Sequence, residues 1–260
     1  MTLSTQAKRS SGLDHLLRDF KTAPVEENTP SKSQPSPRID LLLRMFQNYL
    51  EDEKYHQRGY FNDDALDYLS VAPTPIEINA LVQAAMRFEK HPHAYEVFSP
   101  FVTHLIQNSY NQGHNNFVIT NDLPNILWDF FGGELCGKEE RPLHLEMDGN
   151  VCDGFFHLAK YVHVRLDGDI RGECGKQSEF SSFEITGSVG SCAERARNSI
   201  YTLNAIRKSN YRIEEEPVEC TFRTPNEQII PRLLAGIPAG NRIVYVQKDG
   251  TEKMMRNYDD

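Results

Sequence analysis

Apolar residues recur at fixed positions in residues 143–199, which divide into three units of 19 residues. In each unit, apolar and polar residues alternate over five positions, which is the pattern of a strand with one buried face. A fixed period near 20 residues is typical of a solenoid, in which each unit buries its apolar face against its neighbours. The positions that we expect to stack inside are Leu145, Val164 and Phe183; Met147, Leu166 and Ile185; and Val151, Ile170 and Val189.

A glycine follows the alternating pattern at the same place in every unit: Gly149, Gly168 and Gly187. We expect a corner of the coil there, with a positive φ that other residues resist. The fourth turn is one residue shorter, because the distance from Phe183 to Tyr201 is 18 residues.

Before the repeat, the apolar period is helical. Residues 39–50 carry one apolar stripe, and Thr74-Pro75-Ile76-Glu77 has the order of a capping box with a first-turn proline. Ser99-Pro100 is expected to open the last helix, which ends near Gly113. From Phe117 the period changes to two, which indicates the first strand.

After the repeat, the chain returns to mixed elements. Residues 224–227 read as a helix start, and Pro231 must kink or split that helix. Residues 242–246 read as a strand and 248–250 as a hairpin turn. We expect this region to cover the last rung of the coil.

The predicted fold class is therefore α+β: an N-terminal helical domain, then a short β-solenoid with rungs of about 19 residues, then a C-terminal cap of helix and strand. The expected segments are an arm at 1–37, the helical domain at 38–113, the solenoid at 114–224 and the cap at 225–260.

The arm has two parts. Residues 22–37 are rich in Pro, Ser and Thr, which is typical of a disordered linker. Ahead of it, apolar residues with helical spacing form one face: Leu13, Leu16, Leu17 and Phe20. Three interpretations stay open: a docking peptide for an unknown protein partner, a helix that packs on its own body, or no stable structure.

One outward face carries the best candidate for a cation site. The 19-residue register stacks His144 over His163 and Asp148 over Asp167, and adjacent carboxylates repel unless something neutralises them. The alternative is a solvated face on which aspartate before glycine is ordinary turn chemistry.

Composition narrows the function classes. The net charge of −9 argues against a broad nucleic-acid surface, and no apolar run is long enough to span a membrane.

The cysteine count of five is odd and no CxxC occurs, so we expect reduced thiols in a cytoplasmic protein. Cys136 and Cys174 share a repeat position with Phe155, which predicts buried cysteines. No phosphate loop, nucleophile elbow or HExxH occurs, and we expect no cofactor.

Two segments carry a resemblance to known repeats. Gly168-Asp169, Cys174-Gly175 and Ser178, followed by residues 220–226 (CTFRTPN), resemble archaeal proteins with a GDxGxxCGxxSxxxxFxI unit, as does QNSYNQGHNNF at 107–117. The unit is more distantly similar to the glycine-repeat β-helices of the glutamate synthase C-terminal domain and of one formylmethanofuran dehydrogenase component. The resemblance implies a β-helix over roughly residues 100–250, and no catalytic residue, because in glutamate synthase this β-helix is a spacer.

Two functional hypotheses follow. The first is a non-catalytic cytoplasmic scaffold or protein-interaction module built on the solenoid. The alternative is an enzyme or accessory subunit that uses the His/Asp face or the junction between helices and solenoid. A concave site with converging polar groups is what separates the two.

Overall fold

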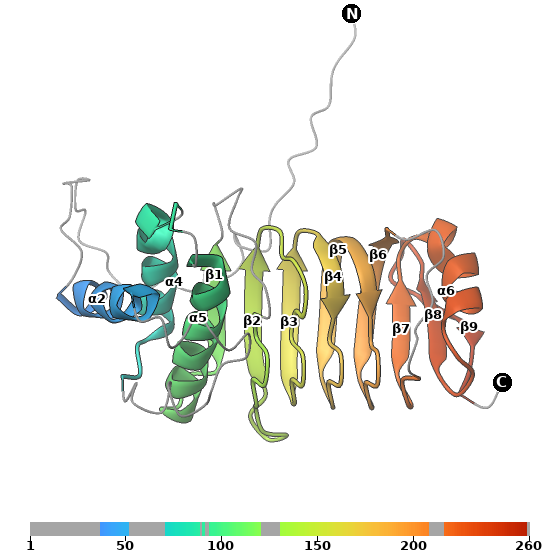
Figure 1. The fold of residues 1–260 in the computed structure, drawn as a ribbon. Helices are drawn as coiled ribbons and strands as arrows, with labels where there is room; N and C mark the ends of the chain where they lie inside the picture. Colours follow the sequence, from blue (N-terminus) through green and yellow to red (C-terminus); the bar gives the residue numbers. More distant parts are fainter. Residues whose placement is uncertain are drawn as a thin grey trace, which may run out of the picture. The chain divides into compact units, whose positions relative to one another are not determined.

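The computed structural model describes residues 37–51, 71–88, 90–91, 94–120, 131–207 and 216–258. Residues 37–260 form one compact unit, in which a single buried core runs from the helices into the sheet. The α+β prediction is confirmed: helices come first, a parallel β-solenoid follows, and a helix and strands end the chain (Figure 1).

The helical part contains α2 (Pro37–Glu51), α4 (Pro75–Ala84), the 3-10 helix η2 (Ala85–Phe88) and α5 (Ala94–Asn111). The capping box at Thr74 is confirmed, since its side chain accepts from the Glu77 amide and its own amide donates to the Glu77 carboxylate. The predicted start of the last helix at Ser99-Pro100 is wrong. Helix α5 begins at Ala94 and contains Pro100, with the Thr103 hydroxyl donating to the Ser99 carbonyl at 2.8 Å.

The described strands form one sheet in which consecutive rungs pair in parallel. The strands are β1 (Asn116–Thr120), β2 (Leu143–Asp148), β3 (Val162–Asp167), β4 (Ile170–Cys174), β5 (Ser182–Cys192), β6 (Ile200–Ile206), β7 (Thr221–Thr224), β8 (Arg242–Val246) and β9 (Glu252–Arg256). Only β9 is antiparallel to its neighbour, β8, in the described part of the chain.

The 19-residue register is confirmed. Met147 pairs with Leu166, and Leu166 with Ile185, and all three side chains are buried. The shorter fourth turn is confirmed too, because Phe183 pairs with Tyr201. Inside the coil, the rings of Phe183, Tyr201 and Phe222 stack at centroid distances of 5.1 and 5.4 Å, which links three rungs.

The predicted positive φ is wrong for two of the three repeated glycines. Gly149 has a φ of 117°, but Gly168 and Gly187 are not among the residues with positive φ, and Gly187 lies within β5. A Cβ on Gly168 would overlap the Gly149 carbonyl oxygen, and one on Gly187 would meet the Gly168 carbonyl. The later glycines are therefore required by the close approach of neighbouring rungs rather than by φ.

The left-handed corners lie elsewhere in each rung. Positive φ recurs at Leu158, Gln177 and Arg195, with values of 58°, 55° and 55°. None of these residues is a glycine, asparagine or aspartate, so the stacked rungs must hold this conformation against its intrinsic cost.

The cysteine prediction holds in part. Phe155 is in register with Cys174 and Cys174 with Cys192, and all three are buried. Cys136 is exposed and bridges to Lys160 instead, so its predicted place beside Phe155 is wrong. Equal spacing misleads there because Cys136 lies before the first regular rung. The chain does not yet follow the 19-residue path at that point.

Both ends of the coil carry added elements. Helix α4 packs against β1, where the Asn79 side chain accepts from the Thr120 amide at 3.0 Å and Gln83 donates to the Thr120 carbonyl. At the other end, the expected helix is split as predicted, into η3 (Glu227–Ile229) and α6 (Ile230–Gly236), with Pro231 in the first turn of α6.

Candidate functional site

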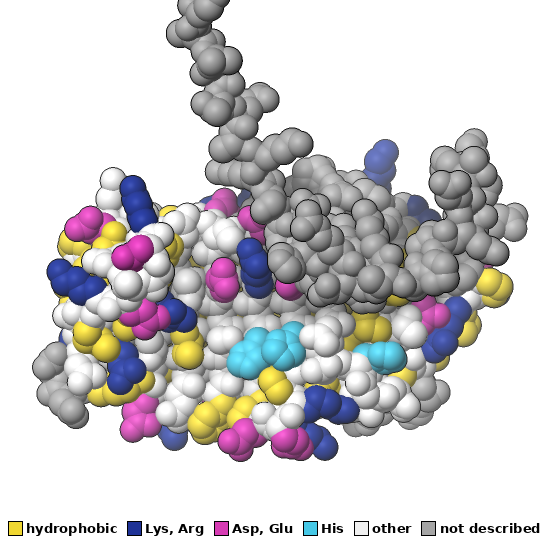
Figure 2. All heavy atoms as spheres, turned by 180° about the vertical axis from the view of Figure 1, so that it is seen from behind, with side chains coloured by type: hydrophobic (Ala, Val, Ile, Leu, Met, Phe, Trp, Pro, Cys, Tyr) yellow, Lys and Arg dark blue, Asp and Glu magenta, His cyan; other side chains and the backbone are white. Residues whose placement is uncertain are grey.

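The predicted His/Asp face separates into two pairs. His144 and His163 are in register on β2 and β3, with ring centroids 5.0 Å apart, and histidine side chains lie side by side on this surface (Figure 2). Asp148 and Asp167 are also in register, but four residues further along the same strands. At about 3.3 Å per residue, the two pairs are about 13 Å apart.

One aspartate of the pair, Asp167, has a hydrogen-bond partner on the next rung. The Thr186 hydroxyl donates to Asp167 at 2.6 Å, and both aspartates are exposed to solvent. Within the described residues, no group of three or more His, Cys, Asp or Glu side chains is close enough to hold a metal ion. The structure thus brings the predicted ligands together two by two and not as a set of four.

The histidine pair has a serine beside it. His163 Nδ1 and the Ser182 hydroxyl lie 2.6 Å apart, one rung from each other. Burial, and then the neighbouring charge of His144, lower the pKa of His163 below its usual 6.5. A neutral imidazole next to a hydroxyl is the first requirement for nucleophilic catalysis.

Among the described residues, the surroundings of Ser182 lack the second requirement, which is a set of free donors for an oxyanion. Strand β5 pairs with β3 on one side and β6 on the other, so its backbone N–H groups are used in the ladder. Ser182 is also absent from the lining of the corner hollow, formed by residues 158–218 of four rungs, that is described below.

At the helix–solenoid junction, which is the alternative place for an enzyme site, described side chains of both parts contact one another. The Arg141 guanidinium lies 4.4 Å from the ring centroid of Tyr110 and donates to the Tyr110 carbonyl, while the Tyr110 hydroxyl donates to the Arg141 carbonyl at 2.6 Å. Gln107 closes the same seam with hydrogen bonds to the carbonyl and amide of Cys136.

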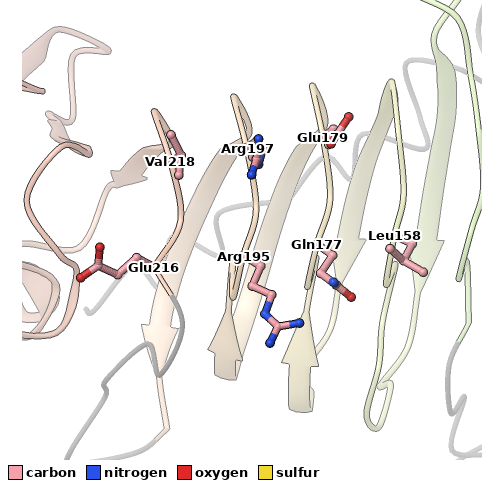
Figure 3. Close-up of a pocket in the computed structure, with 7 residues that line it drawn as sticks. All are labelled: Leu158, Gln177, Glu179, Arg195, Arg197, Glu216 and Val218. Carbon is pink, nitrogen blue, oxygen red and sulfur yellow. The ribbon is translucent and has the colours of Figure 1, made fainter.

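A concave site that the sequence analysis did not predict lies at the left-handed corners. We call it the corner groove; it has a volume of about 350 Å³ and crosses four rungs (Figure 3). Two columns of side chains line it, and Figure 3 shows them as two parallel rows. The lining residues are Leu158, Gln177, Arg195 and Glu216 in one column and Glu179, Arg197 and Val218 in the other.

The local sequence explains why a groove forms. The residue between the two columns is small and fully buried in three successive rungs: Ala159, Ser178 and Ala196. That residue points inward, and its neighbours on either side point outward. Each rung therefore contributes two outward side chains, with a small buried residue between them at the bottom of the groove. With rungs about 4.8 Å apart, four rungs give a groove about 14 Å long.

The groove walls combine apolar and charged groups. Leu158 and Val218 are 43% and 47% exposed, which is high for large aliphatic side chains. Two arginines and two glutamates among the lining residues balance in charge. This mixture fits a polypeptide better than a polyanion, whose sites are strongly basic.

Ion pairs and stacked rings continue the groove's edge. Lys160 pairs with Glu179 at 3.1 Å, and that hydrogen bond raises the pKa of Lys160. The rings of Tyr161 and Phe180 stack at 5.2 Å with an interplanar angle of 11°, and Phe180 is 43% exposed. The edge is therefore ordered by contacts between rungs and also presents apolar surface to solvent.

Sequence reasoning missed the groove because it followed the glycines and the strand faces. One signal was present in the sequence. Leu158 and Gln177 occupy the same repeat position, and in the first unit the apolar Leu158 is followed by a small residue, Ala159. The predicted partner-binding residues of the arm, Leu13, Leu16, Leu17 and Phe20, lie outside the described residues.

Comparisons with protein-family models, with curated proteins and with solved structures found no match. The geometry of the described faces is therefore what supports a functional proposal. In the described part of the chain, no helix is long and apolar enough to cross a membrane.

Proposed function

We propose that this protein is a non-catalytic cytoplasmic scaffold that binds another polypeptide in the corner groove. The observation that carries the proposal is the hollow of about 350 Å³ that crosses four rungs and is lined by exposed aliphatic and balanced charged side chains. Stacked rungs hold these columns rigidly, so binding costs little ordering of the scaffold.

The groove is concave, but its polar side chains stand in two columns along four rungs and do not converge on one point as an enzyme site requires. Two further features favour a polypeptide ligand. Interfaces between proteins combine apolar anchors with arginine and a polar rim, and the groove has Leu158 and Val218 beside Arg195 and Arg197. A length of about 14 Å accommodates four or five residues of extended chain.

Charge reversal in the groove tests the proposal. The double variant Arg195→Glu/Arg197→Glu changes the groove from balanced to strongly acidic, and Arg171→Glu is the matched control because Arg171 is exposed on β4, outside the lining. Tagged full-length protein would be cross-linked in native cells and the captured proteins quantified. We expect a partner that wild type and the control recover and that the double variant loses. Equal recovery by all three proteins, or none by wild type, would contradict the proposal.

The N-terminal arm supplies a second proposed contact. An amphipathic segment with Leu13, Leu16, Leu17 and Phe20 on one side, tethered by a Pro/Ser-rich stretch, has the pattern of a docking peptide. Deleting residues 1–37 should leave the melting temperature nearly unchanged and reduce partner recovery. A large fall in melting temperature would mean that the segment belongs to the core.

A hydrolase is the second candidate, because His163 Nδ1 lies 2.6 Å from the Ser182 hydroxyl. An activated-ester substrate separates it from the scaffold. If wild type hydrolyses p-nitrophenyl acetate well above the rate of Ser182→Ala, the pair is catalytic. The scaffold proposal expects equal rates for both proteins, since the described backbone beside the hydroxyl is used in the strand ladder and offers no free oxyanion donors.

A further inference from the structure

Two imidazole rings lie next to each other on strands that their neighbours hold in place. His144 is the second residue of β2 and His163 the second residue of β3, and the two residues pair in register. Their ring centroids are 5.0 Å apart, with an interplanar angle of 35°. Strands β1 and β5 pair with the outer edges of β2 and β3, so backbone hydrogen bonds on both sides oppose any separation of the rings. Groups on such strands keep their geometry better than groups on loops.

The separation of the two rings suits the binding of one metal ion. A Zn–N bond of about 2.1 Å, added to the roughly 1.1 Å from the nitrogen to the ring centre, places the ion about 3.2 Å from each centroid. A tetrahedral N–Zn–N angle then puts the centroids about 5.2 Å apart, and a right angle puts them about 4.5 Å apart. The observed 5.0 Å lies between these values, so the rings are spaced for one ion without movement of the rungs.

A hydrogen bond to Ser182 provides an independent indication of metal binding. The Ser182 hydroxyl, one rung away, lies 2.6 Å from Nδ1 of His163. When Nδ1 carries the proton and donates it to this oxygen, the lone pair of the ring is on Nε2, which can then bind a metal. Metal-binding histidines commonly have such a partner on their second nitrogen, because it orients the ring and selects the tautomer.

The charges around the histidine pair favour a cation. Along the same ladder, the neighbours are Asn116 on β1 and Ser182 on β5, and neither is charged. Two residues further along the strands, a second ladder contains Glu146, Arg165 and Glu184, and Arg165 pairs with Glu184 at 4.0 Å. These three side chains together carry one negative charge, which attracts a metal ion from about 7 Å away.

We propose that His144 and His163 bind one Zn²⁺ ion between them, with Ser182 as the positioning residue for His163. Imidazole nitrogen suits Zn²⁺, whereas Mg²⁺ and Ca²⁺ prefer oxygen ligands. Two protein ligands leave two tetrahedral positions for water or for a side chain of a bound molecule. The site uses none of the residues that line the corner groove, so it stands independently of the proposed scaffold function.

Calorimetric titration of Zn²⁺ into metal-free, full-length protein at about pH 7.5, where imidazole is neutral and can bind a metal, tests the site. The chain has nine histidines, so single variants are needed to assign the binding. His144→Gln and His163→Gln should each raise the Kd of the tightest Zn²⁺ site about tenfold or more, because a single imidazole cannot chelate the ion. His157→Gln is the matched control: His157 belongs to the same solenoid, with its Nε2 2.7 Å from the Gln177 side chain, and should leave the Kd unchanged.

Two results of this titration would overturn the proposal. A wild type that binds no Zn²⁺ below about 1 mM has no such site. Equal Kd values for wild type, His144→Gln and His163→Gln would mean that the ion binds only adventitiously elsewhere on the chain. Excess Mg²⁺ should not displace Zn²⁺ from the wild type, and displacement would show that the ligands are oxygen atoms.

The role of Ser182 has its own test. Loss of a hydrogen-bond partner behind a metal ligand weakens metal binding by about 10–100-fold, and Ser182→Ala should raise the Kd for Zn²⁺ by that order. Ser182→Thr keeps the hydroxyl and should restore most of the affinity. If Ser182→Ala binds Zn²⁺ as wild type does, Ser182 does not position the ligand.

Electron paramagnetic resonance with Cu²⁺ as the probe counts the nitrogen ligands directly, because Cu²⁺ also prefers imidazole. The wild-type spectrum should show splitting from two equivalent imidazole nitrogens, and His163→Gln should show splitting from one. This readout does not depend on affinity. A wild-type spectrum with one nitrogen, or an unchanged spectrum in His163→Gln, would contradict binding between the two rings.

Discussion

Replacing Gly168 by alanine tests the packing of one rung on the next. An added Cβ would overlap the Gly149 carbonyl oxygen and lie 2.6 Å from the Gly149 carbonyl carbon. Both atoms belong to the backbone, so the rungs must separate to relieve the overlap. Separation weakens the local ladder, in which the Gly149 amide donates to Asp167 and the Gly187 amide to Gly168.

We expect Gly168→Ala to lower the free energy of unfolding by about 2–3 kcal/mol, at the upper end of overpacking effects. Gly240→Ala is the matched control: Gly240 has a φ of 77° but no atom within 4 Å of its added Cβ. Its loss should be only the cost of a left-handed alanine, about 1 kcal/mol. Urea denaturation followed by circular dichroism measures both. If Gly168→Ala costs no more than Gly240→Ala, close approach of the rungs is not what requires this glycine.

Three further outcomes can be measured on the same protein. Leu166→Ala should cost about 2–5 kcal/mol in urea denaturation, as for other buried leucines, and a loss under about 1 kcal/mol would contradict its interior position. Because burial and His144 lower the pKa of His163, the unfolded chain binds the proton more readily, so stability should fall as the pH drops below about 6.5. The variant His163→Gln should flatten that pH dependence. An unchanged slope of stability against pH would contradict the lowered pKa of His163. Iodoacetamide should modify exposed Cys136 well before Cys220, because burial raises the pKa of the Cys220 thiol to about 11. Equal rates of modification in the native protein would contradict the burial of Cys220.

The repeat made the solenoid predictable because alternation and spacing act together. Leu145, Val164 and Phe183 fix which face is buried, and the 19-residue period fixes the register, so strand pairing follows. The shorter turn before Tyr201 could be counted in the same way.

Conformation at single positions was harder to predict. The role of Gly168 depends on the distance between two backbones, and a recurring glycine gives the same signal for close approach as for positive φ. The corners with positive φ fall at Leu158 and Gln177, residue types that give no sign of that conformation. The stacked rungs override local preference there.

The candidate site was the least predictable part. The 19-residue spacing placed His144 beside His163 correctly. That spacing does not describe the distance along the strand from His144 to Asp148. The corner groove depends on which way consecutive residues point at an irregular corner, and no simple period describes that geometry.

Photo-cross-linking from inside the corner groove tests the scaffold account most directly. Val218 is 47% exposed and lines the groove, so benzoylphenylalanine in its place would contact a bound polypeptide. Glu184, exposed on β5 and outside the lining, is the control position. On irradiation in native cells, the account predicts a discrete protein adduct from position 218 and not from position 184. No adduct from position 218, or the same adducts from both positions, would contradict it.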